Sequence, residues 1–375
     1  MRAWTLGLAL AASLGWLGPR AVAAQEPVAG KPWYESVTVN GFVEASYTWN
    51  LDHPDSDLDV LRVFDYDDSE IKLDVAELVV QRPAVKRGDL GFRIDATAGQ
   101  SVPAVTAASG LFRDPDSGEA QDYDLHQVFV SWIAPLGEGL RIDAGKFITP
   151  FGMEVIEGHD GYNDNQTRSL LFGYSIPFTH TGLRFTYPLG AKVTATAMVV
   201  QGWDNWQDNN GSKSVIVQVA ATPTPRWTLY LNAMGGPEQR DNSREQRYLY
   251  NAVGIFKPSD RLTFGLDLVL GDEEHLGAGG GRARWSGVAG YAKWAFDSSW
   301  SLALRGEVFD DPDGARTGTS QKLHEVTLTP EWKVTPHLVL RADLRRDRSD
   351  EEVFQHRAEP ASAQTTVTFA ALLLY

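Results

Sequence analysis

Residues 37–49 read VTVNGFVEASYTW, and this stretch decides the fold class. Its odd-numbered positions, from Val37 to Trp49, are apolar or small, whereas its even-numbered positions are polar except for Phe42. Side chains that alternate with a period of two point to opposite faces of a β-strand. The stretch therefore predicts a strand with one apolar face and one polar face.

The same alternation recurs along most of the chain, and helical periodicity is absent throughout. It is clearest in residues 90–96, 140–144, 181–187 and 338–345, where Arg and Asp stand in mid-strand on the polar face. A soluble β-sandwich also alternates. Here, however, short connections alternate with long polar ones, and this pattern is typical of an outer-membrane barrel.

Sixteen strands are expected, separated by seven short turns and eight long loops. An even number is typical of bacterial single-chain barrels. The strands are predicted near residues 37–49, 71–82, 89–98, 124–133, 139–147, 181–187, 192–202, 213–222, 226–234, 247–256, 261–270, 283–296, 299–309, 322–333, 337–346 and 364–375. The segment 71–82 fits least well, because Leu78 and Val80 are out of phase with its first residues. A further short strand over 169–176 would raise the count to 18.

The predicted fold is thus all-β: a single transmembrane antiparallel β-barrel of about 16 strands, with short periplasmic turns and long extracellular loops. Residues 4–17 are apolar and follow Arg2, and small residues precede Gln25. We expect residues 1–24 to be a signal peptide, residues 25–36 a short periplasmic segment and residues 37–375 the barrel. A retained membrane anchor is the alternative, although the apolar run is short for a span.

The composition excludes several function classes. The 375 residues include no cysteine, which excludes a disulfide scaffold, a thiolate metal site and a Cys nucleophile. The net charge of −15 argues against a nucleic-acid partner. The eight histidines lie in no catalytic or metal-binding motif, so we expect no enzyme activity, no cofactor and no metal.

The connection 50–70 is the most acidic of the long loops. Asp55, Asp57 and Asp59 are spaced as in a calcium loop, but the glycine and the glutamate that such a loop requires are missing. A solvated acidic surface is the preferred interpretation, and calcium binding is the alternative.

Aromatic residues gather at the short-turn ends of the predicted strands, on the apolar face. Amphipathic rings prefer the membrane interface. The predicted girdle consists of Trp132, Tyr187, Trp227, Phe256, Trp300, Trp332 and Tyr375. Candidates for the opposite girdle are Trp49, Phe147 and Trp203.

Residues 145–154, 163–171 and 177–184, together with residues 41–47 and 76–78, resemble the β-barrel outer-membrane porins of the OmpL-like type. The resemblance extends over most of the chain after residue 24 and is sharpest in residues 139–184. It implies a passive diffusion channel in the bacterial outer membrane, surrounded by lipid and lipopolysaccharide, and it implies no particular substrate. General porins are trimers, so the resemblance suggests a homotrimer, but no feature of the sequence fixes the oligomeric state. The alternating last strand, which ends in Tyr375, is similar to the signal that the barrel assembly machinery reads.

The longest connection spans residues 148–180. In general porins the third long loop folds into the lumen, so the resemblance implies that this loop is the pore constriction. The alternative is a loop that caps the barrel from outside. The charged residues of the predicted constriction are Glu154, Glu157, Asp160, Asp164 and Arg168.

The lumen-facing wall carries both signs of charge. The predicted pore-wall residues are Glu44, Arg93, Asp95, Arg141, Asp143, Arg184, Asp267, Arg305, Glu307, Arg341, Asp343 and Arg345. Carboxylates on the loop, facing wall arginines across an eyelet, would set up a transverse field. Because the wall charges nearly cancel, we expect the loop carboxylates to favour cations weakly. The plainer alternative is that wall Arg and Asp residues pair across strands and hold the wall together.

The predicted function is therefore a porin through which ions and small hydrophilic solutes diffuse passively. An anion porin would need a dense cluster of Lys and Arg at the constriction, where the loop offers Arg168 and no Lys. The alternative from another class is an occluded surface barrel whose acidic loops have a structural or adhesive binding role.

Overall fold

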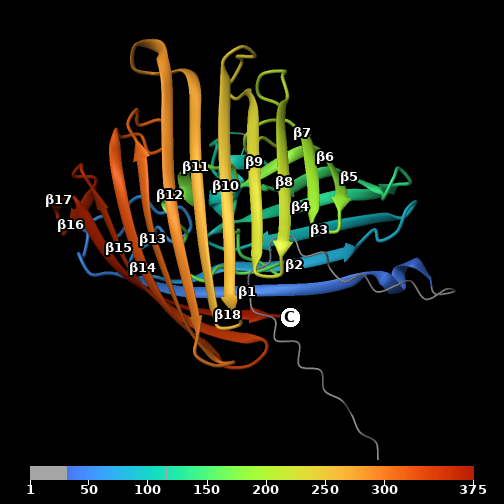
Figure 1. Ribbon diagram of the computed structural model, residues 1–375. Helices are drawn as coiled ribbons and strands as arrows, with labels where there is room; N and C mark the ends of the chain where they lie inside the picture. Colours follow the sequence, from blue (N-terminus) through green and yellow to red (C-terminus); the bar gives the residue numbers. More distant parts are fainter. Residues whose placement is uncertain (1–31, 115) are drawn as a thin grey trace, which may run out of the picture.

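The computed structural model describes residues 32–114 and 116–375, so the predicted signal peptide and residues 25–31 lie outside the described residues. Sixteen antiparallel strands form one closed barrel (Figure 1), in which each strand pairs with its neighbours in sequence and β1 pairs with β18. The barrel strands are β1 (Thr38–Asn50), β2 (Ile71–Arg82), β3 (Leu90–Ala98), β4 (Tyr123–Ala134), β5 (Leu140–Ile148), β6 (Thr179–Gly190), β7 (Val193–Val200), β8 (Ser214–Thr224), β9 (Trp227–Pro237), β10 (Gln246–Ser259), β11 (Leu262–Gly277), β12 (Gly281–Ala295), β13 (Trp300–Asp311), β14 (Gln321–Lys333), β15 (Leu338–Ser349) and β18 (Ala363–Leu374).

This arrangement confirms the predicted fold, and each predicted strand overlaps one observed barrel strand. The alternative of 18 barrel strands is wrong. Part of the segment 169–176 forms a π-helical turn, η2 (Leu171–Ser175), inside the barrel. The two remaining strands, β16 (Phe354–His356) and β17 (Glu359–Ala361), form a separate hairpin in the last long loop.

The other helical segments are short: η1 (Trp33–Ser36), α1 (Val102–Ser109) in the loop between β3 and β4, and η3 (Ala278–Gly280) between β11 and β12. No helix in the described part of the chain has the length and apolar character that a membrane crossing requires.

The period-two pattern places polar side chains inside the barrel. In β1, Glu44 and Thr48 are buried, whereas Val43 and Trp49 are exposed on the outer surface. An apolar outer face is what contact with lipid requires, and a barrel of this size encloses a space that side chains of the wall alone do not fill.

A β-bulge explains the irregular phase of β2. Val75 pairs with Glu44 and Leu73 pairs with Ala45, so Asp74 is an extra residue in the ladder. The bulge shifts the alternation by one position. Leu73 and Leu78 therefore both lie on the exposed outer surface, although their spacing in the sequence is odd.

Aromatic side chains lie on the outer surface at the short-turn ends of the strands, as in the cross-strand pairs Trp227–Phe256 and Trp300–Trp332. Their ring centroids are 4.5 Å and 5.4 Å apart, and both pairs are stacked. Their position at a membrane interface stays a prediction. Two candidates for the opposite girdle are wrong, because Phe147 and Trp203 are buried inside the barrel.

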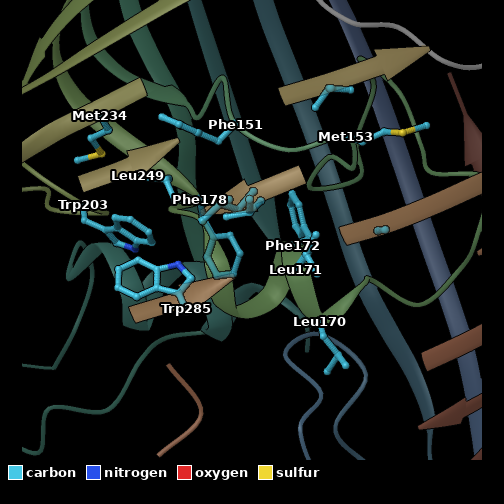
Figure 2. Close-up of a cluster of buried hydrophobic side chains, with 14 of the residues drawn as sticks. Phe151, Met153, Leu170, Leu171, Phe172, Phe178, Trp203, Met234, Leu249 and Trp285 are labelled. Carbon is cyan, nitrogen blue, oxygen red and sulfur yellow. The ribbon is translucent and has the colours of Figure 1, made fainter. Parts of the chain in front are cut away.

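An apolar cluster fixes the loops inside the barrel (Figure 2). The loop between β5 and β6 contributes Phe151, Leu170, Leu171, Phe172 and Phe178. Inward-facing residues of the wall complete it, among them Met234, Leu249 and Trp285. Burial of several large side chains gives the loop a fixed place, so it is a packed element of the fold.

Candidate functional site

The loop that connects β5 to β6 crosses the interior of the barrel. Its backbone N–H groups reach carboxylates on strands that are distant from β5 and β6. Met153 donates to Asp267 on β11 (2.8 Å), Leu171 to Glu307 on β13 (3.0 Å) and Thr167 to Asp343 on β15 (2.8 Å). These contacts do not fit a loop that caps the barrel from outside.

Three predicted wall carboxylates are thus anchors for the loop. Asp343 also accepts hydrogen bonds from the backbone of Gln166 (3.1 Å) and from the hydroxyl of Thr329 (2.6 Å). Buried backbone N–H groups need acceptors, and the inner wall supplies them where the loop has no secondary structure.

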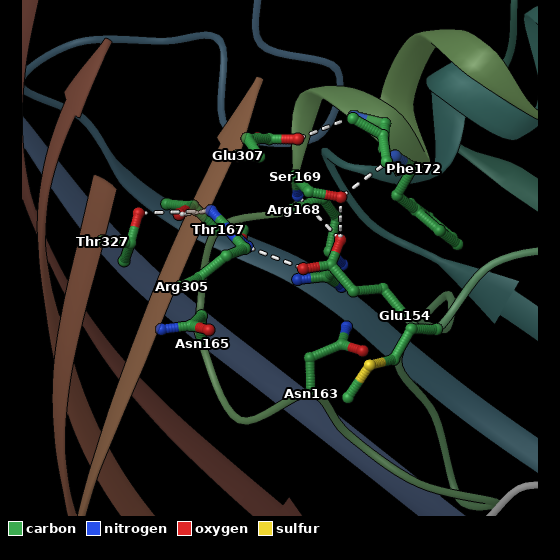
Figure 3. Close-up of polar contacts among 12 residues, drawn as sticks. Glu154, Asn163, Asn165, Thr167, Arg168, Ser169, Phe172, Arg305, Glu307 and Thr327 are labelled. Carbon is green, nitrogen blue, oxygen red and sulfur yellow. Dashed lines mark hydrogen bonds and ion pairs between the residues drawn. The ribbon is translucent and has the colours of Figure 1, made fainter. Parts of the chain in front are cut away.

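Arg305 of β13 joins the loop to the wall at the centre of a polar network (Figure 3). Its guanidinium donates to Glu154 on the loop (2.7 Å). It also donates to Glu325 on β14 (3.0 Å) and to the carbonyl of Thr167 (2.5 Å). The second oxygen of Glu154 accepts a hydrogen bond from the backbone of Ser169 (2.7 Å). The hydroxyl of Thr327 is a fourth partner (3.2 Å), and because Arg305 is completely buried, these groups take the place of water around its charge.

The other loop charges are paired in the same way. Nη2 of Arg341 contacts both carboxylate oxygens of Glu157 (2.7 Å and 2.6 Å), and Arg168 lies 3.5 Å from Glu157. Asp164 pairs with Lys293 of β12 (2.7 Å). Arg345 pairs with Asp347 (2.8 Å), and Glu44 accepts a hydrogen bond from Gln166.

The expected transverse field is therefore not what the geometry shows. Glu154 and Glu157 touch their arginines directly instead of facing them across an open eyelet. The physical reason is that ionised side chains away from water need a partner of opposite charge. These two carboxylates, with side chains at most 2% exposed, have little contact with solvent.

A second group of charges consists of side chains on the inner face of β3, β5 and β6 together with Asp160 of the loop, and it is more open. The exposed fractions of the side chains are 12% for Arg93, 35% for Arg141, 19% for Arg184 and 49% for Asp160. Arg93 contacts Asp95 (2.8 Å) and Asp160 (2.7 Å). Arg141 and Arg184 share the buried Asp143, at 2.9 Å and 2.8 Å. These wall charges pair with acidic neighbours, which is the plainer alternative given in the sequence analysis. The three arginines nevertheless remain partly in contact with solvent.

Sequence reasoning missed several members of these networks. Glu325 and Lys293 face inward with the same parity as their buried neighbours Thr327 and Tyr291, so strand parity could have identified them. Asn163 and Gln166 lie in the loop, where no periodicity exists to indicate which side chains turn toward the wall.

No three or more His, Asp or Glu side chains within residues 32–114 and 116–375 form a group that could hold a metal ion. In the acidic loop, Asp55 and Asp57 are exposed, whereas Asp59 is buried and accepts a hydrogen bond from Asn50 (2.8 Å). Calcium binding by this loop would need several oxygen ligands that converge on one point, and the described residues of the loop supply no such set.

Asp204, in the loop between β7 and β8, anchors the far end of the crossing loop. Its Oδ1 accepts hydrogen bonds from the backbone of Phe178 (2.5 Å) and Thr179 (2.9 Å). Burial raises the pKa of Asp204 to about 6, although both hydrogen bonds favour the charged form.

A pH dependence of stability follows from this pKa. Because the folded form binds the proton more tightly than the unfolded chain, stability should rise as the pH falls through about 6. We expect Asp204 to contribute about 1 kcal/mol between pH 7.5 and pH 5. The Asp204→Asn variant keeps the acceptor oxygen, and asparagine tolerates the φ of 62° at this position. Its urea midpoint should change less with pH than that of the wild type; equal slopes would contradict the assignment.

The comparisons with known proteins agree with this architecture. Residues 36–374 match the family model described as "Putative beta-barrel porin-2, OmpL-like". No curated protein sequence matches the chain.

Several solved barrels are similar in structure. The outer membrane channel DcaP of Acinetobacter baumannii has a TM-score of 0.63 at 10% identity, with 90% of this chain and 97% of that chain covered. An anion-selective porin from Comamonas acidovorans has a TM-score of 0.61 at 12% identity, with 91% and 99% covered. The trimer form of OmpT from Vibrio cholerae has a TM-score of 0.58 at 9% identity, with 90% and 99% covered. At such low identities the likeness shows the fold alone.

Proposed function

The chain belongs to the OmpL-like family of β-barrel porins, which places it in the bacterial outer membrane as a channel, and from this premise we propose that ions and small hydrophilic solutes diffuse passively through it. The single observation that carries the proposal is the unequal exposure of the inner wall. On β13, β14 and β15 the inward side chains are almost all buried under the crossing loop, whereas Arg93, Arg141 and Arg184 on β3, β5 and β6 are partly exposed.

We propose that residues 148–180 form the constriction and that the path follows the wall of β3, β5 and β6. The loop is packed against the opposite side of the barrel through Glu154, Glu157 and Asp164. Solutes would pass between the loop and the side chains of Arg93, Arg141 and Arg184. No step of this process makes or breaks a covalent bond.

We also propose that the channel weakly favours cations. The groups responsible differ from the full set of loop carboxylates that the sequence analysis indicated. The carboxylates Glu154, Glu157 and Asp164 are buried in ion pairs, so they contribute little to the field in the path. Asp160 is half-exposed, and the acidic outer loops belong to a chain with a net charge of −15. Both would raise the local concentration of cations.

Single-channel recording in a planar bilayer, with a KCl gradient, tests this proposal. The wild type should show discrete conductance steps and a reversal potential on the cation side. Asp160→Asn should lower the ratio of cation to anion permeability by about two- to fivefold, the size expected for one solvated charge close to the passing ion. Glu138→Gln, which neutralises an exposed carboxylate in the short turn between β4 and β5, is the matched control and should leave that ratio nearly unchanged.

An anion-side reversal potential in the wild type would mean that the arginines govern selectivity. The absence of conductance from a verified folded barrel would instead favour the alternative of an occluded surface barrel.

We also propose lipid and lipopolysaccharide as the surroundings, the barrel assembly machinery as the partner of β18, and a homotrimer as the assembly. The outer face of β18 presents Phe369 and Leu373, and Tyr375 follows the strand; all three are exposed, which supports contact with lipid or with a second protein. The trimer form of OmpT is a property of that protein, and it makes a trimer the first arrangement to test for this chain.

A further inference from the structure

A second hollow lies at the long-loop end of the barrel, apart from the proposed path. Three connections build it: the segment after β3 that contains α1, the loop between β7 and β8, and the loop between β9 and β10. Its volume is about 580 Å³, a figure that includes the space at its open mouth.

Hydrogen bonds between these connections hold the hollow open. The backbone of Trp206 donates to the carbonyl of Ser109 at the end of α1 (2.9 Å). The backbone of Asp241 donates to the carbonyl of Asn209 (2.9 Å), and the side-chain amide of Asn209 donates to the carbonyl of Glu238 (3.1 Å). The lining is thus fixed before any ligand arrives, which lowers the entropic cost of binding.

The side chains that line the hollow share a distinct chemistry. Those able to contact a ligand are Arg113, Asn205, Trp206, Gln207, Asn209 and Arg240. None of them is acidic, although the chain as a whole is strongly acidic. The two arginines are exposed, and neither guanidinium is paired with a carboxylate of the described residues.

Nearby carboxylates are engaged elsewhere. Asp114 accepts hydrogen bonds from the backbone and hydroxyl of Ser117, at 2.7 Å and 3.0 Å. Asp208 pairs with Lys213. The two guanidinium groups are therefore free to bind an anion.

We propose that this hollow binds an acidic saccharide, a sugar ring that carries a carboxylate or a phosphate. The indole of Trp206 offers an apolar surface for the C–H face of a sugar ring. The three amide side chains can both donate and accept hydrogen bonds with hydroxyl groups. Arg113 and Arg240 supply charge-assisted hydrogen bonds to the acid. The site is separate from the constriction, so it stands even if the barrel conducts differently from the proposal above.

Isothermal titration of the full barrel in detergent, with D-glucuronate and with D-glucose, tests the site. Glucuronate should bind at least about tenfold more tightly than glucose, because the acid adds charge-assisted hydrogen bonds. The double variant Arg113→Gln with Arg240→Gln should lose this difference, and Trp206→Ala should weaken both sugars.

Arg357→Gln is the matched control, since Arg357 is an exposed arginine of another outer loop. Equal affinities for both sugars in the wild type, no binding of either sugar, or a preference for glucuronate that survives in the double variant would overturn the proposal. Circular dichroism of each variant verifies that the barrel is folded.

The acidic saccharide has two sources, a free solute and the phosphorylated sugars of lipopolysaccharide. Titration with phosphorylated core oligosaccharide released from lipopolysaccharide distinguishes them. Binding more than tenfold tighter than that of glucuronate would identify lipopolysaccharide as the ligand. Equal or weaker binding would identify a free acidic sugar, and either result supports the site.

Discussion

Arg305→Ala should release the crossing loop from the wall and enlarge the channel. The wild-type guanidinium satisfies Glu154 on the loop and Glu325 on β14, both of which are buried. Without it, two carboxylates and the carbonyl of Thr167 lose their charged partner inside the barrel. Breaking a buried ion pair in this way costs about 3–5 kcal/mol.

The loop can reduce this loss of stability by moving Glu154 into water. The wall cannot do the same with Glu325, because β14 is held in the barrel by its neighbouring strands. We therefore expect a larger and noisier single-channel conductance for Arg305→Ala, together with a lower urea midpoint. Conductance in a planar bilayer and urea titration in detergent are the two measurements.

Matched variants separate this effect from a general loss of stability. Arg284→Ala removes an exposed arginine of β12 and should change neither quantity. Glu154→Ala frees only the loop side of the network, because Arg305 keeps Glu325, so it should enlarge the channel with a smaller loss of stability. Wild-type conductance in both Arg305→Ala and Glu154→Ala would show that the loop does not narrow the path.

The barrel itself could be predicted from the sequence because lipid and water impose opposite requirements on alternate residues. Strand β1 shows this, since its outer and inner residues can be read from the parity of their numbers. The bulge at Asp74 breaks the parity in β2 and accounts for the one segment that fitted badly.

The roles of the charged side chains could not be predicted in the same way. Parity places Glu307 and Asp343 on the inner wall, but it does not show that both accept backbone hydrogen bonds from the loop. That outcome depends on the path of an irregular segment, which tertiary packing decides. Trp203 lies in such a loop and is buried within the barrel for the same reason. Phe147 is different, because it shares the odd parity of Arg141 and Asp143 in β5, so parity alone could have placed it inside.

Replacement of the three open arginines should have the largest effect on selectivity. In the variant Arg93→Gln, Arg141→Gln and Arg184→Gln, the carboxylates Asp95 and Asp143 lose their cationic partners. The solvent-exposed charge between the loop and these strands then becomes negative, because Asp160 of the loop faces Arg93 and the remaining cation of β5, Lys146, is buried and paired with Asp124. A surface of one sign in a narrow passage raises the concentration of counter-ions at least about tenfold.

The reversal potential in a KCl gradient at pH 8 should therefore move strongly toward the cation limit, and the shift should shrink at high salt because ions screen the exposed charges. A control variant neutralises three exposed cations at the short-turn end, Lys86, Arg226 and Arg261, and should shift the potential little. Equal shifts in the two triple variants would place the selectivity in the overall charge of the protein. A large shift confined to the first variant would locate the ion path along these three strands, since only a charge close to the passing ion acts with such strength.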